Sequence, residues 1–435
     1  MSDEVRIARI RERLAARVVS AARIADDRIA DALREVPRHL FLPHVPPDSA
    51  YRDDAIVTKR DADGQPISSS SQPAIMAIML DQLALAPGLR VLEIGAGTGY
   101  NAALMKHIVG PSGTVVSVDI DADVAGQARD HLAAAGYPDV TVAAVDGAEG
   151  YPQAAPYDRV IATVGVADLA PSWLEQLDPA GRIVVPFDVR GTQLAVAFER
   201  ADDGRWASVS LVPCGFMRMR GSRAGPERTV PLSPGLSLML PDGLTLADGK
   251  DVDAEALAGY LAGPAVELPT GVRSGATQVI WGLGLWLAAE DPRSCTVTDE
   301  RPARGRGAGT AGPGGSATPR LKRAPVRHRR LRLTAGIVDS GGLALLTAAP
   351  ASSQGSAAGG GPGPLTLEIA GFGPHASELA AELAAHVRAW DHAGQPGADG
   401  LHVDAYPRSA GAGPAPDHAG LLIERPSMRF VVFHA

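Results

Sequence analysis

Hydrophobic side chains in residues 3–36 recur every three or four positions, which is the spacing of one helix face. The repeat consists of Ile7, Ile10, Leu14, Val18, Ile24, Ile29, Leu33 and Val36. Pro37 ends the pattern, because proline lacks the amide hydrogen that a helix interior requires. We therefore predict helix over residues 3–36.

The pattern becomes polar after Pro37 and turns apolar again at Gln72. Prolines make residues 43–47 a loop, and Asp61–Gly64 contains a turn signal. Four serines, Ser68 to Ser71, close this polar stretch, and we predict that they form a loop. Gln72 and Pro73 then open an apolar helix, in which a proline near the first position is favourable.

From residue 89, short apolar runs alternate with helical repeats. Strands are predicted at residues 90–94, 114–120, 140–145, 159–163 and 182–186, and helices at residues 100–109, between Asp121 and Gly136, and at residues 173–177. Strands that alternate with helices indicate a parallel sheet covered on both faces. The predicted fold class is therefore α/β, with a Rossmann-like sheet.

Beyond residue 226 the pattern is weaker, and we predict a smaller α+β domain there. Strands are expected at residues 343–348, 365–369 and 428–433, and one helix carries Leu379, Leu383, Val387 and Trp390 on a single face. Residues 303–331 and 349–364 are rich in glycine and small residues, which is typical of flexible linkers. The predicted organisation is an N-terminal helical and serine-rich segment (1–88), a central domain (89–225) and a C-terminal extension (226–435).

Composition narrows the functional classes. The chain has 435 residues and a formal net charge of −8, so no basic field favours nucleic acid. The two cysteines, Cys214 and Cys295, lie in no metal-ligand spacing, and we expect no metal. The N-terminus lacks an apolar signal core, and no apolar run reaches a membrane-spanning length, so we expect a soluble cytoplasmic protein without membrane contact. The oligomeric state stays open.

Three alternating glycines follow the first predicted strand of the α/β region. Gly95, Gly97 and Gly99 lie between that strand and a helix, where glycine allows a tight turn and close approach to a nucleotide. A dinucleotide site favours glycine in the sixth place of the turn, where this chain has Tyr100. The lysine ending of a phosphate-binding loop is also absent. The spacing favours a different adenosine ligand.

Acidic residues at three strand ends favour S-adenosylmethionine as that ligand. Glu93 can face its cationic end, Asp119 can accept both ribose hydroxyls, and Asp146 with Gly147 can read an adenine edge. An aspartate at a strand end is often only a helix cap, but the three acids are in register with the glycine turn. The candidate cofactor-binding residues are Glu93, Gly95, Gly97, Thr98, Gly99, Tyr100, Asn101, Asp119, Ile120, Asp146, Gly147 and Thr163.

With these motifs in place, residues 5–200 resemble the protein-L-isoaspartate O-methyltransferases. The matching blocks are Val36–Pro43, Ser71–Pro73, Gly95–Asn101, Asp146–Gly147, Pro156–Asp158 and Gly181–Pro186. The resemblance implies transfer of a methyl group to an isoaspartyl carboxylate in a peptide or protein, followed by succinimide formation. It places Ser71, with Ser70 and Ser69 beside it, at the substrate carboxylate. A carboxylate of pKa about 4 is already ionised at neutral pH, so this chemistry needs orientation and desolvation rather than a base.

Several departures from the family pattern leave the acceptor open. Ser69 and Ser70 replace a threonine and an isoleucine, Thr58–Gly64 adds polar residues, and Cys214–Gly221 matches no repair-enzyme block. These features resemble an extended branch found with lanthipeptide and graspetide pathways, which implies methylation of a normal aspartate in one ribosomal peptide, recognised through the C-terminal extension. The alternatives are a general repair enzyme, a catalytically silent binding protein, or a small-molecule or nucleic-acid methyltransferase. Against the last, the Asn-Pro-Pro-Tyr type of motif is absent at Ala162–Gly165.

Overall fold

The computed structural model describes residues 3–62, 64–226, 228–300, 321, 323–328, 331–349, 364–408 and 420–434. The chain divides into two compact units. Unit 1 comprises Met1–Asp188, Gln193–Gly225 and Leu401–Ala435, and unit 2 comprises Val189–Thr192 and Pro226–Gly400. The range predicted as one C-terminal extension is therefore split, because its last strands pair with the sheet of unit 1. The two predicted linkers lie almost entirely outside the described residues.

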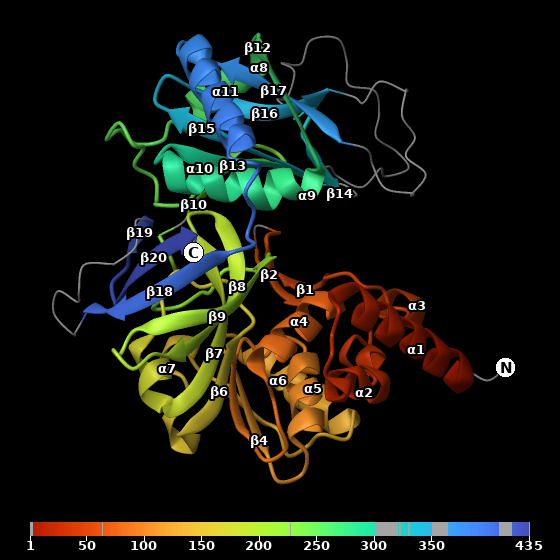
Figure 1. Ribbon diagram of the computed structural model, residues 1–435. Helices are drawn as coiled ribbons and strands as arrows, with labels where there is room; N and C mark the ends of the chain where they lie inside the picture. Colours follow the sequence, from red (N-terminus) through yellow and green to blue (C-terminus); the bar gives the residue numbers. More distant parts are fainter. Residues whose placement is uncertain are drawn as a thin grey trace. The chain divides into compact units, whose positions relative to one another are not determined.

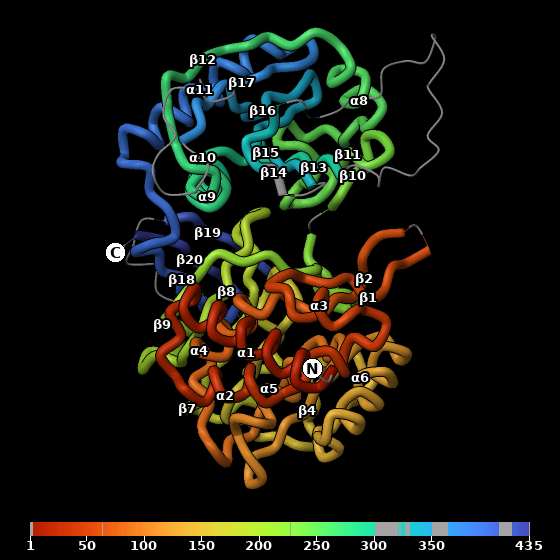
Figure 2. The backbone as a smooth tube through the Cα atoms, turned by 90° about the vertical axis from the view of Figure 1, so that its right-hand side faces the viewer, coloured from red at the N-terminus to blue at the C-terminus, as the bar shows by residue number. Residues whose placement is uncertain are grey.

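Unit 1 is built on a ten-stranded sheet with the order β19-β20-β18-β9-β8-β7-β6-β3-β4-β5. Its strands are β3 (Arg90–Ile94), β4 (Thr114–Asp119), β5 (Thr141–Ala144), β6 (Tyr157–Ala162), β7 (Leu177–Val189), β8 (Thr192–Arg200), β9 (Trp206–Cys214), β18 (Leu401–Pro407), β19 (Leu421–Glu424) and β20 (Met428–His434). Strands β3 to β7 pair in parallel, as the alternating pattern predicts. Strands β18 to β20 continue the sheet beyond β9 as antiparallel neighbours (Figure 1, Figure 2).

Helices cover both faces of this sheet. They are α1 (Asp3–Ala22), α2 (Asp27–Glu35), α3 (Pro47–Ala50), α4 (Pro73–Leu83), α5 (Tyr100–Val109), α6 (Ala122–Ala134) and α7 (Pro171–Gln176). Helices α4, α5 and α6 lie on one face and α7 on the other, with α1 and α2 packed outside α4 and α5 (Figure 1). The predicted α/β class is confirmed, and the parallel strands end where α5 and α6 begin.

The N-terminal helix is interrupted, whereas its hydrophobic repeat predicted one continuous element. Helix α1 ends at Ala22, and Arg23 adopts a left-handed conformation with φ of 54°. The Asp26 side chain then accepts a hydrogen bond from the amide of Arg28 and caps α2. The repeat hides this break because Ile24 is buried in the same core as the helical positions on either side.

The polar stretch before the apolar helix forms an antiparallel hairpin. Strand β1 (Ile56–Arg60) pairs with β2 (Pro66–Ser70), and the predicted turn signal connects them. Three of the four serines therefore lie on a strand rather than in a loop. Because the hairpin fixes their alternation, Ser68 and Ser70 are buried while Ser69 is half-buried.

Unit 2 is an α+β domain around an eight-stranded sheet. The strand order is β10-β11-β13-β15-β16-β17-β12, with β14 beside β15. The strands are β10 (Arg228–Ser233), β11 (Leu236–Leu240), β12 (Val266–Ser274), β13 (Ser294–Glu300), β14 (Val326–His328), β15 (Leu331–Asp339), β16 (Gly342–Ala349) and β17 (Leu365–Phe372). The helices are α8 (Ala254–Ala262), α9 (Ala276–Gln278), α10 (Gly284–Glu290) and α11 (Ala376–His392).

The predicted apolar helix of unit 2 is confirmed as α11, and its hydrophobic face packs on the sheet (Figure 1). Trp390 is fully buried there, and its indole nitrogen donates to the carbonyl of Pro396 at 2.9 Å. Burial with a satisfied polar atom is the behaviour of a core tryptophan. Trp390 therefore stabilises unit 2 rather than forming a binding surface.

Candidate functional site

The glycine turn between β3 and α5 is a site of close backbone approach. Gly95 has a φ of 104° and Gly97 a φ of 52°, conformations that favour glycine. A Cβ on Gly95 would lie 2.8 Å from Oγ1 of Thr163, which donates to the Gly95 carbonyl at 2.6 Å. A Cβ on Gly97 would lie 3.2 Å from the carbonyl oxygen of Ser69. The turn is therefore enclosed by Thr163 on one side and by β2 on the other. We call β2, with Ser68 to Ser70, the serine strand.

Asp119 ends β4 beside this turn, as the sequence predicts. Its carboxylate accepts the amide of Gly97 at 3.1 Å and the amide of Asp121 at 3.1 Å. Burial raises the pKa of Asp119, and the two amide hydrogen bonds and the nearby charge of Arg220 act in the opposite direction. Ile120 follows with a side chain that is 40% exposed. A partly desolvated carboxylate beside an exposed apolar side chain suits a ribose and an adenine ring.

Asp146 lies after β5 and is covered by a distant part of the chain. One of its carboxylate oxygens accepts the amide of Ala148 at 3.0 Å, and the other accepts the amide of Ser222 at 2.8 Å. These hydrogen bonds lower the pKa of Asp146 despite the opposing effect of burial. Gly147 is buried against Ile94, where a Cβ would meet Cγ2 of Ile94 at 2.5 Å. Both residues thus lie at the strand ends where the motif predicts them.

The serine strand faces the glycine turn through its last residues. Ser70 is buried, and its hydroxyl has no hydrogen-bond partner among the residues that the structure describes. Ser71 follows β2, and its carbonyl accepts a guanidinium N–H of Arg38 at 3.0 Å. A buried hydroxyl without a partner is costly unless a ligand completes it. Of the four serines, Ser70 therefore has the hydroxyl that most needs a hydrogen-bond acceptor from a ligand.

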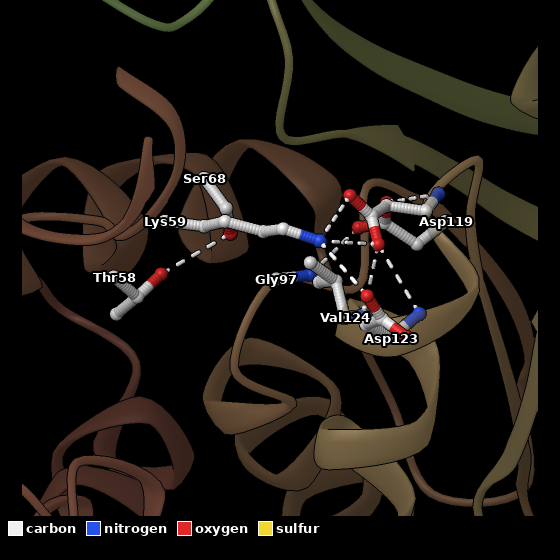
Figure 3. A network of polar contacts seen from close by, with 8 residues as sticks. Thr58, Lys59, Ser68, Gly97, Asp119, Asp123 and Val124 are labelled. Atoms are coloured by element: carbon white, nitrogen blue, oxygen red, sulfur yellow. Dashed lines mark hydrogen bonds and ion pairs between the residues drawn. The ribbon is translucent and has the colours of Figure 1, made fainter. Parts of the chain in front are cut away.

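An ion pair links the hairpin to the strand end that carries Asp119. Lys59 on β1 reaches the carboxylate of Asp121 with its Nζ at 2.8 and 2.7 Å, and Asp123 lies 3.4 Å from the same nitrogen. Figure 3 shows the Lys59 side chain extended from β1 towards the residues around Asp119 and Gly97. Lys59 belongs to the polar residues that depart from the family pattern. The ion pair therefore connects the β1–β2 hairpin to the segment between β4 and α6.

Reversing this pair tests whether it holds the hairpin in place. We expect Lys59→Asp to lower several-fold the rate of the methyl transfer that the sequence predicts, because it places three acids together and repels β1 from the start of α6. The double variant Lys59→Asp with Asp121→Lys is expected to recover most of the rate at low salt. Steady-state rates at 20 and 500 mM salt measure this. If the double variant is as slow as the single variant, the ion pair does not hold the hairpin in place.

The sequence motifs do not reveal the role of Arg38, which is fully buried in unit 1. Its guanidinium donates to the carbonyl of Ala50 at 2.9 Å and to that of Ser71, and it lies 4.9 Å from the ring centre of Tyr100. Arg38 thus ties the serine strand to the N-terminal segment. The Val36–Pro43 block marks Arg38 as part of a motif. The sequence does not show which carbonyls Arg38 binds, because Ala50 and Ser71 lie 12 and 33 residues away.

Three predicted cofactor residues, Glu93, Tyr100 and Asn101, point away from the turn. Glu93 is fully buried and accepts hydrogen bonds from Asn101 at 2.7 Å and Ser117 at 2.6 Å. It therefore joins α5 to β4 instead of facing a cationic ligand. Tyr100 is buried against Phe41 and Arg38, and the Thr98 carbonyl lies 3.1 Å from Nδ1 of His131. Tyr100 and Asn101 point inwards because they form the first turn of α5 and are buried there.

Other kinds of site find little support in the described part of the chain. No group of three or more histidine, cysteine, aspartate or glutamate side chains is placed to hold a metal ion among the described residues. Within the same residues, no helix combines the length and apolar character needed to cross a bilayer. The candidate site therefore lies at the strand ends of unit 1.

Comparison with known proteins identifies the family. Residues 10–223 match the family "Protein-L-isoaspartate(D-aspartate) O-methyltransferase". A protein-L-isoaspartate O-methyltransferase of Methanopyrus kandleri is 39% identical over 226 residues, which cover 97% of that protein and 52% of this chain. The chain belongs to the protein-L-isoaspartate O-methyltransferase family. It is an S-adenosylmethionine-dependent O-methyltransferase; the glycine turn and the strand-end acids predicted the cofactor, and the family resemblance predicted transfer to oxygen.

Further relatives carry the same description. An Archaeoglobus fulgidus protein is 38% identical over 208 residues, covering 91% of that protein and 47% of this chain. Among solved structures, a protein-L-isoaspartate O-methyltransferase aligns with 91% of this chain and 96% of its own, at 23% identity and a TM-score of 0.47. A Plasmodium falciparum chain in complex with S-adenosyl-L-homocysteine aligns with 48% of this chain and 97% of its own, at 14% identity and a TM-score of 0.42. The family match ends at residue 223, so most of unit 2 and the last strands of unit 1 lie beyond it.

Proposed function

We propose that this methyltransferase acts on the free carboxylate of isoaspartyl residues in peptides or proteins. The observation that carries the proposal is the approach of the serine strand to the glycine turn, where the Ser69 carbonyl lies 3.2 Å from a Cβ position on Gly97. Residues assigned to the acceptor carboxylate and residues assigned to the cofactor thereby share one site. A carboxylate held by the serines would lie close to the cofactor.

The residues at the strand ends fit S-adenosylmethionine. Asp119 would hold the ribose, Asp146 and Gly147 the adenine edge, Ile120 one adenine face, and Gly95 to Gly99 would allow the amino acid end to approach the backbone. The cofactor supplies a methyl group on a positively charged sulfur. The chain's contribution is to orient the two reactants and to exclude water, which strengthens electrostatic interactions between them. Glu93 is not part of this set, because its carboxylate is occupied by Asn101 and Ser117.

The residues that hold the acceptor carboxylate must leave its negative charge unneutralised. A carboxylate is ionised at neutral pH, and a cationic partner would weaken it as a nucleophile. The Ser70 hydroxyl is buried without a partner among the described residues and can donate to such a carboxylate, and Ser71 follows directly after the strand with a second hydroxyl. The Arg38 guanidinium donates to the carbonyls of Ala50 and Ser71, so it positions the end of the strand and does not face the substrate. Neutral hydroxyl donors orient the carboxylate while leaving its charge available for reaction.

Asp119→Ala is expected to weaken cofactor binding strongly. Loss of two hydrogen bonds to a carboxylate costs roughly 2–4 kcal/mol, which corresponds to at least a 30-fold higher dissociation constant. Titration calorimetry with S-adenosylhomocysteine measures the change. Asp130→Ala, which alters an exposed acid on α6, serves as the matched control and should bind normally. Unchanged binding by Asp119→Ala excludes a ribose contact.

Ser70→Ala and Ser71→Ala are expected to lower the turnover number about tenfold each, because each loses a hydrogen bond to a charged acceptor worth roughly 1.5 kcal/mol. Cofactor affinity should remain within twofold of the parent. Ser68→Ala is the matched control, because the Ser68 hydroxyl is already engaged by Thr58 at 3.2 Å. Parental turnover in both Ser70→Ala and Ser71→Ala would remove the carboxylate cradle from the mechanism.

A second candidate is methylation of a normal aspartate in one ribosomal peptide. It is favoured by Ser69 and Ser70, which replace two residues of the family pattern, and by unit 2, which lies almost entirely outside the family match. Unit 2 would then recognise the peptide, and the ester would collapse to a succinimide and hydrolyse to isoaspartate.

One assay separates the two candidates. The full chain is incubated with cofactor and a pair of short peptides that differ only in isoaspartyl or aspartyl linkage, and methyl ester formation is followed by mass spectrometry. We expect esterification of the isoaspartyl peptide alone. Failure on both peptides, together with esterification of an aspartate in a cyclised ribosomal peptide, would favour the second candidate instead.

A further inference from the structure

The segment after β9 crosses the strand ends of unit 1. Met217 accepts the amide of Gly165 through its carbonyl at 2.7 Å, and the Met219 amide donates to the Gly165 carbonyl at 2.8 Å. Met219 is buried, and its methyl carbon lies 3.7 Å from a Cβ position on Gly147. We call residues 217–222 the crossing segment. Its backbone is paired to the turn after β6, so it is an ordered wall of the site.

The crossing segment rests on the two groups assigned to the adenine. The Ser222 amide donates to Asp146, and a Cβ on Gly221 would lie 2.6 and 2.8 Å from the two carboxylate oxygens. The same Cβ would lie 2.8 Å from Cδ1 of Ile120, and Gly221 has a φ of 93°. Only glycine allows this approach without displacing Asp146. The segment therefore determines how the Asp146 carboxylate is oriented.

The turn between β19 and β20 anchors the far end of the crossing segment. The Ser427 amide donates to Oδ2 of Asp168 at 2.8 Å. Arg223, one residue past the segment, donates to the Ser427 hydroxyl and lies 3.6 Å from the same Asp168 oxygen. The Asp168 side chain is only 8% exposed, so its charge depends on these partners.

Two more contacts fix this turn to the sheet. Arg425 donates from Nε to the carbonyl of Ala167 at 3.2 Å. The ring of Phe430 on β20 lies 4.2 Å from that of Phe187 on β7, centre to centre. Residues from about 200 positions later in the chain thus brace the residues beside the adenine groups, all within unit 1.

We propose that the β19–β20 turn belongs to the cofactor-binding machinery, with Asp168, Arg223 and Ser427 as positioning residues. They hold the crossing segment against Asp146 and Ile120 and so shape the outer wall of the adenine subsite. The inference rests on the proposed placement of the cofactor. By this inference, the residues that methyl transfer needs continue past residue 223, where the family match ends. They include the turn between β19 and β20, which follows unit 2 in the chain.

This arrangement has a consequence for base selectivity. The Ser222 and Ala148 amides each occupy one Asp146 oxygen, which holds the carboxylate in one orientation and leaves lone pairs for an exocyclic amine. Adenine offers that amine, whereas hypoxanthine offers an oxygen that a carboxylate repels. If the anchor is lost, Asp146 loses its fixed orientation, and preference for adenine should decline more than binding of the methionine end.

The test compares S-adenosylhomocysteine with S-inosylhomocysteine in titration calorimetry on the full chain. We expect Arg223→Ala to raise the dissociation constant of the adenosyl ligand about tenfold and that of the inosyl ligand less than twofold. Arg223→Lys should restore part of the difference, because it keeps a cationic donor. Arg429→Ala is the matched control, since Arg429 pairs with Glu424 inside the same hairpin at 2.7 Å and should leave both constants unchanged. A merely destabilised protein lowers the active fraction without altering the ratio of the two constants.

The outcomes separate this inference from the cofactor placement beneath it. Arg223 is partly exposed, so its variants should fold, and thermal melting confirms this. If Asp146→Ala removes adenine preference while Arg223→Ala and Asp168→Asn retain it in full, the anchoring role is overturned and the adenine placement stands. If Asp146→Ala itself retains the preference, the adenine placement fails and the inference fails with it. Loss of preference in Asp146→Ala and Arg223→Ala, with the control unaffected, supports both.

Discussion

Arg38→Ala is expected to lower the free energy of unfolding by about 3–5 kcal/mol, because it leaves one buried and one partly buried carbonyl without a donor and opens a cavity. The carbonyls belong to Ala50 and Ser71, which lie 12 and 33 residues from Arg38 along the chain. The stacking of the guanidinium on Tyr100 is lost as well. Urea unfolding followed by circular dichroism measures the change. Turnover of the folded fraction should also fall more than tenfold, since Ser71 loses its tether.

Two other substitutions define the cause of that loss. Arg38→Lys can reach at most one of the two carbonyls, so its stability should lie between those of the parent and Arg38→Ala. Arg34→Ala removes an exposed arginine that pairs with Glu12 and Asp31, and it should leave stability and turnover unchanged. A loss of stability in Arg38→Ala no larger than in Arg34→Ala contradicts the tethering role.

Glu93→Gln is expected to change how stability depends on pH. Burial raises the pKa of Glu93 to about 7 from an ordinary value of 4.5, although the hydrogen bonds from Ser117 and Asn101 favour its ionised form. The folded protein therefore retains a proton that the unfolded chain releases at lower pH. Its contribution to stability is fully present below pH 4.5, declines between pH 4.5 and 7, and is lost above that range.

Glutamine is neutral at every pH and can still bond Asn101 and Ser117, so the variant lacks this decline. Relative to the parent, Glu93→Gln should gain about 3 kcal/mol between pH 4.5 and pH 8. Chemical unfolding of both proteins across this range measures the difference, in which the contribution of Asp119 cancels. Parallel pH profiles for the two proteins would show that Glu93 keeps an ordinary pKa in the folded state.

Local sequence patterns were sufficient for the parallel half of unit 1. The glycine spacing and the apolar runs predicted β3, α5, β4 and α6 and placed Asp119 and Asp146 at strand ends. These features depend on residues close together in the chain, so periodicity and turn chemistry reveal them. The same patterns missed the direction of Glu93, Tyr100 and Asn101, because a side chain's orientation beside a turn depends on what packs around it.

The weaker predictions all concern pairings between distant segments. The serine stretch was expected to be a loop, because its polarity hides the alternation that its pairing with β1 imposes. Strand β20 was predicted as a strand but not as part of unit 1, since its pattern carries no information about its neighbours. The buried tethers of Arg38 and Asp168 likewise join residues that no local pattern connects.

The sequence by itself determined that this protein has an α/β sheet with a glycine turn for S-adenosylmethionine, because those features follow from short-range spacing. Only the tertiary structure decided which residues surround that turn. It brought Ser69 to Gly97, turned Glu93 into the core, and returned strands β18 to β20 to the sheet that carries the glycine turn. The physical reason is that hydrogen bonding between strands is specified by the burial of whole faces, which is a property of the folded chain.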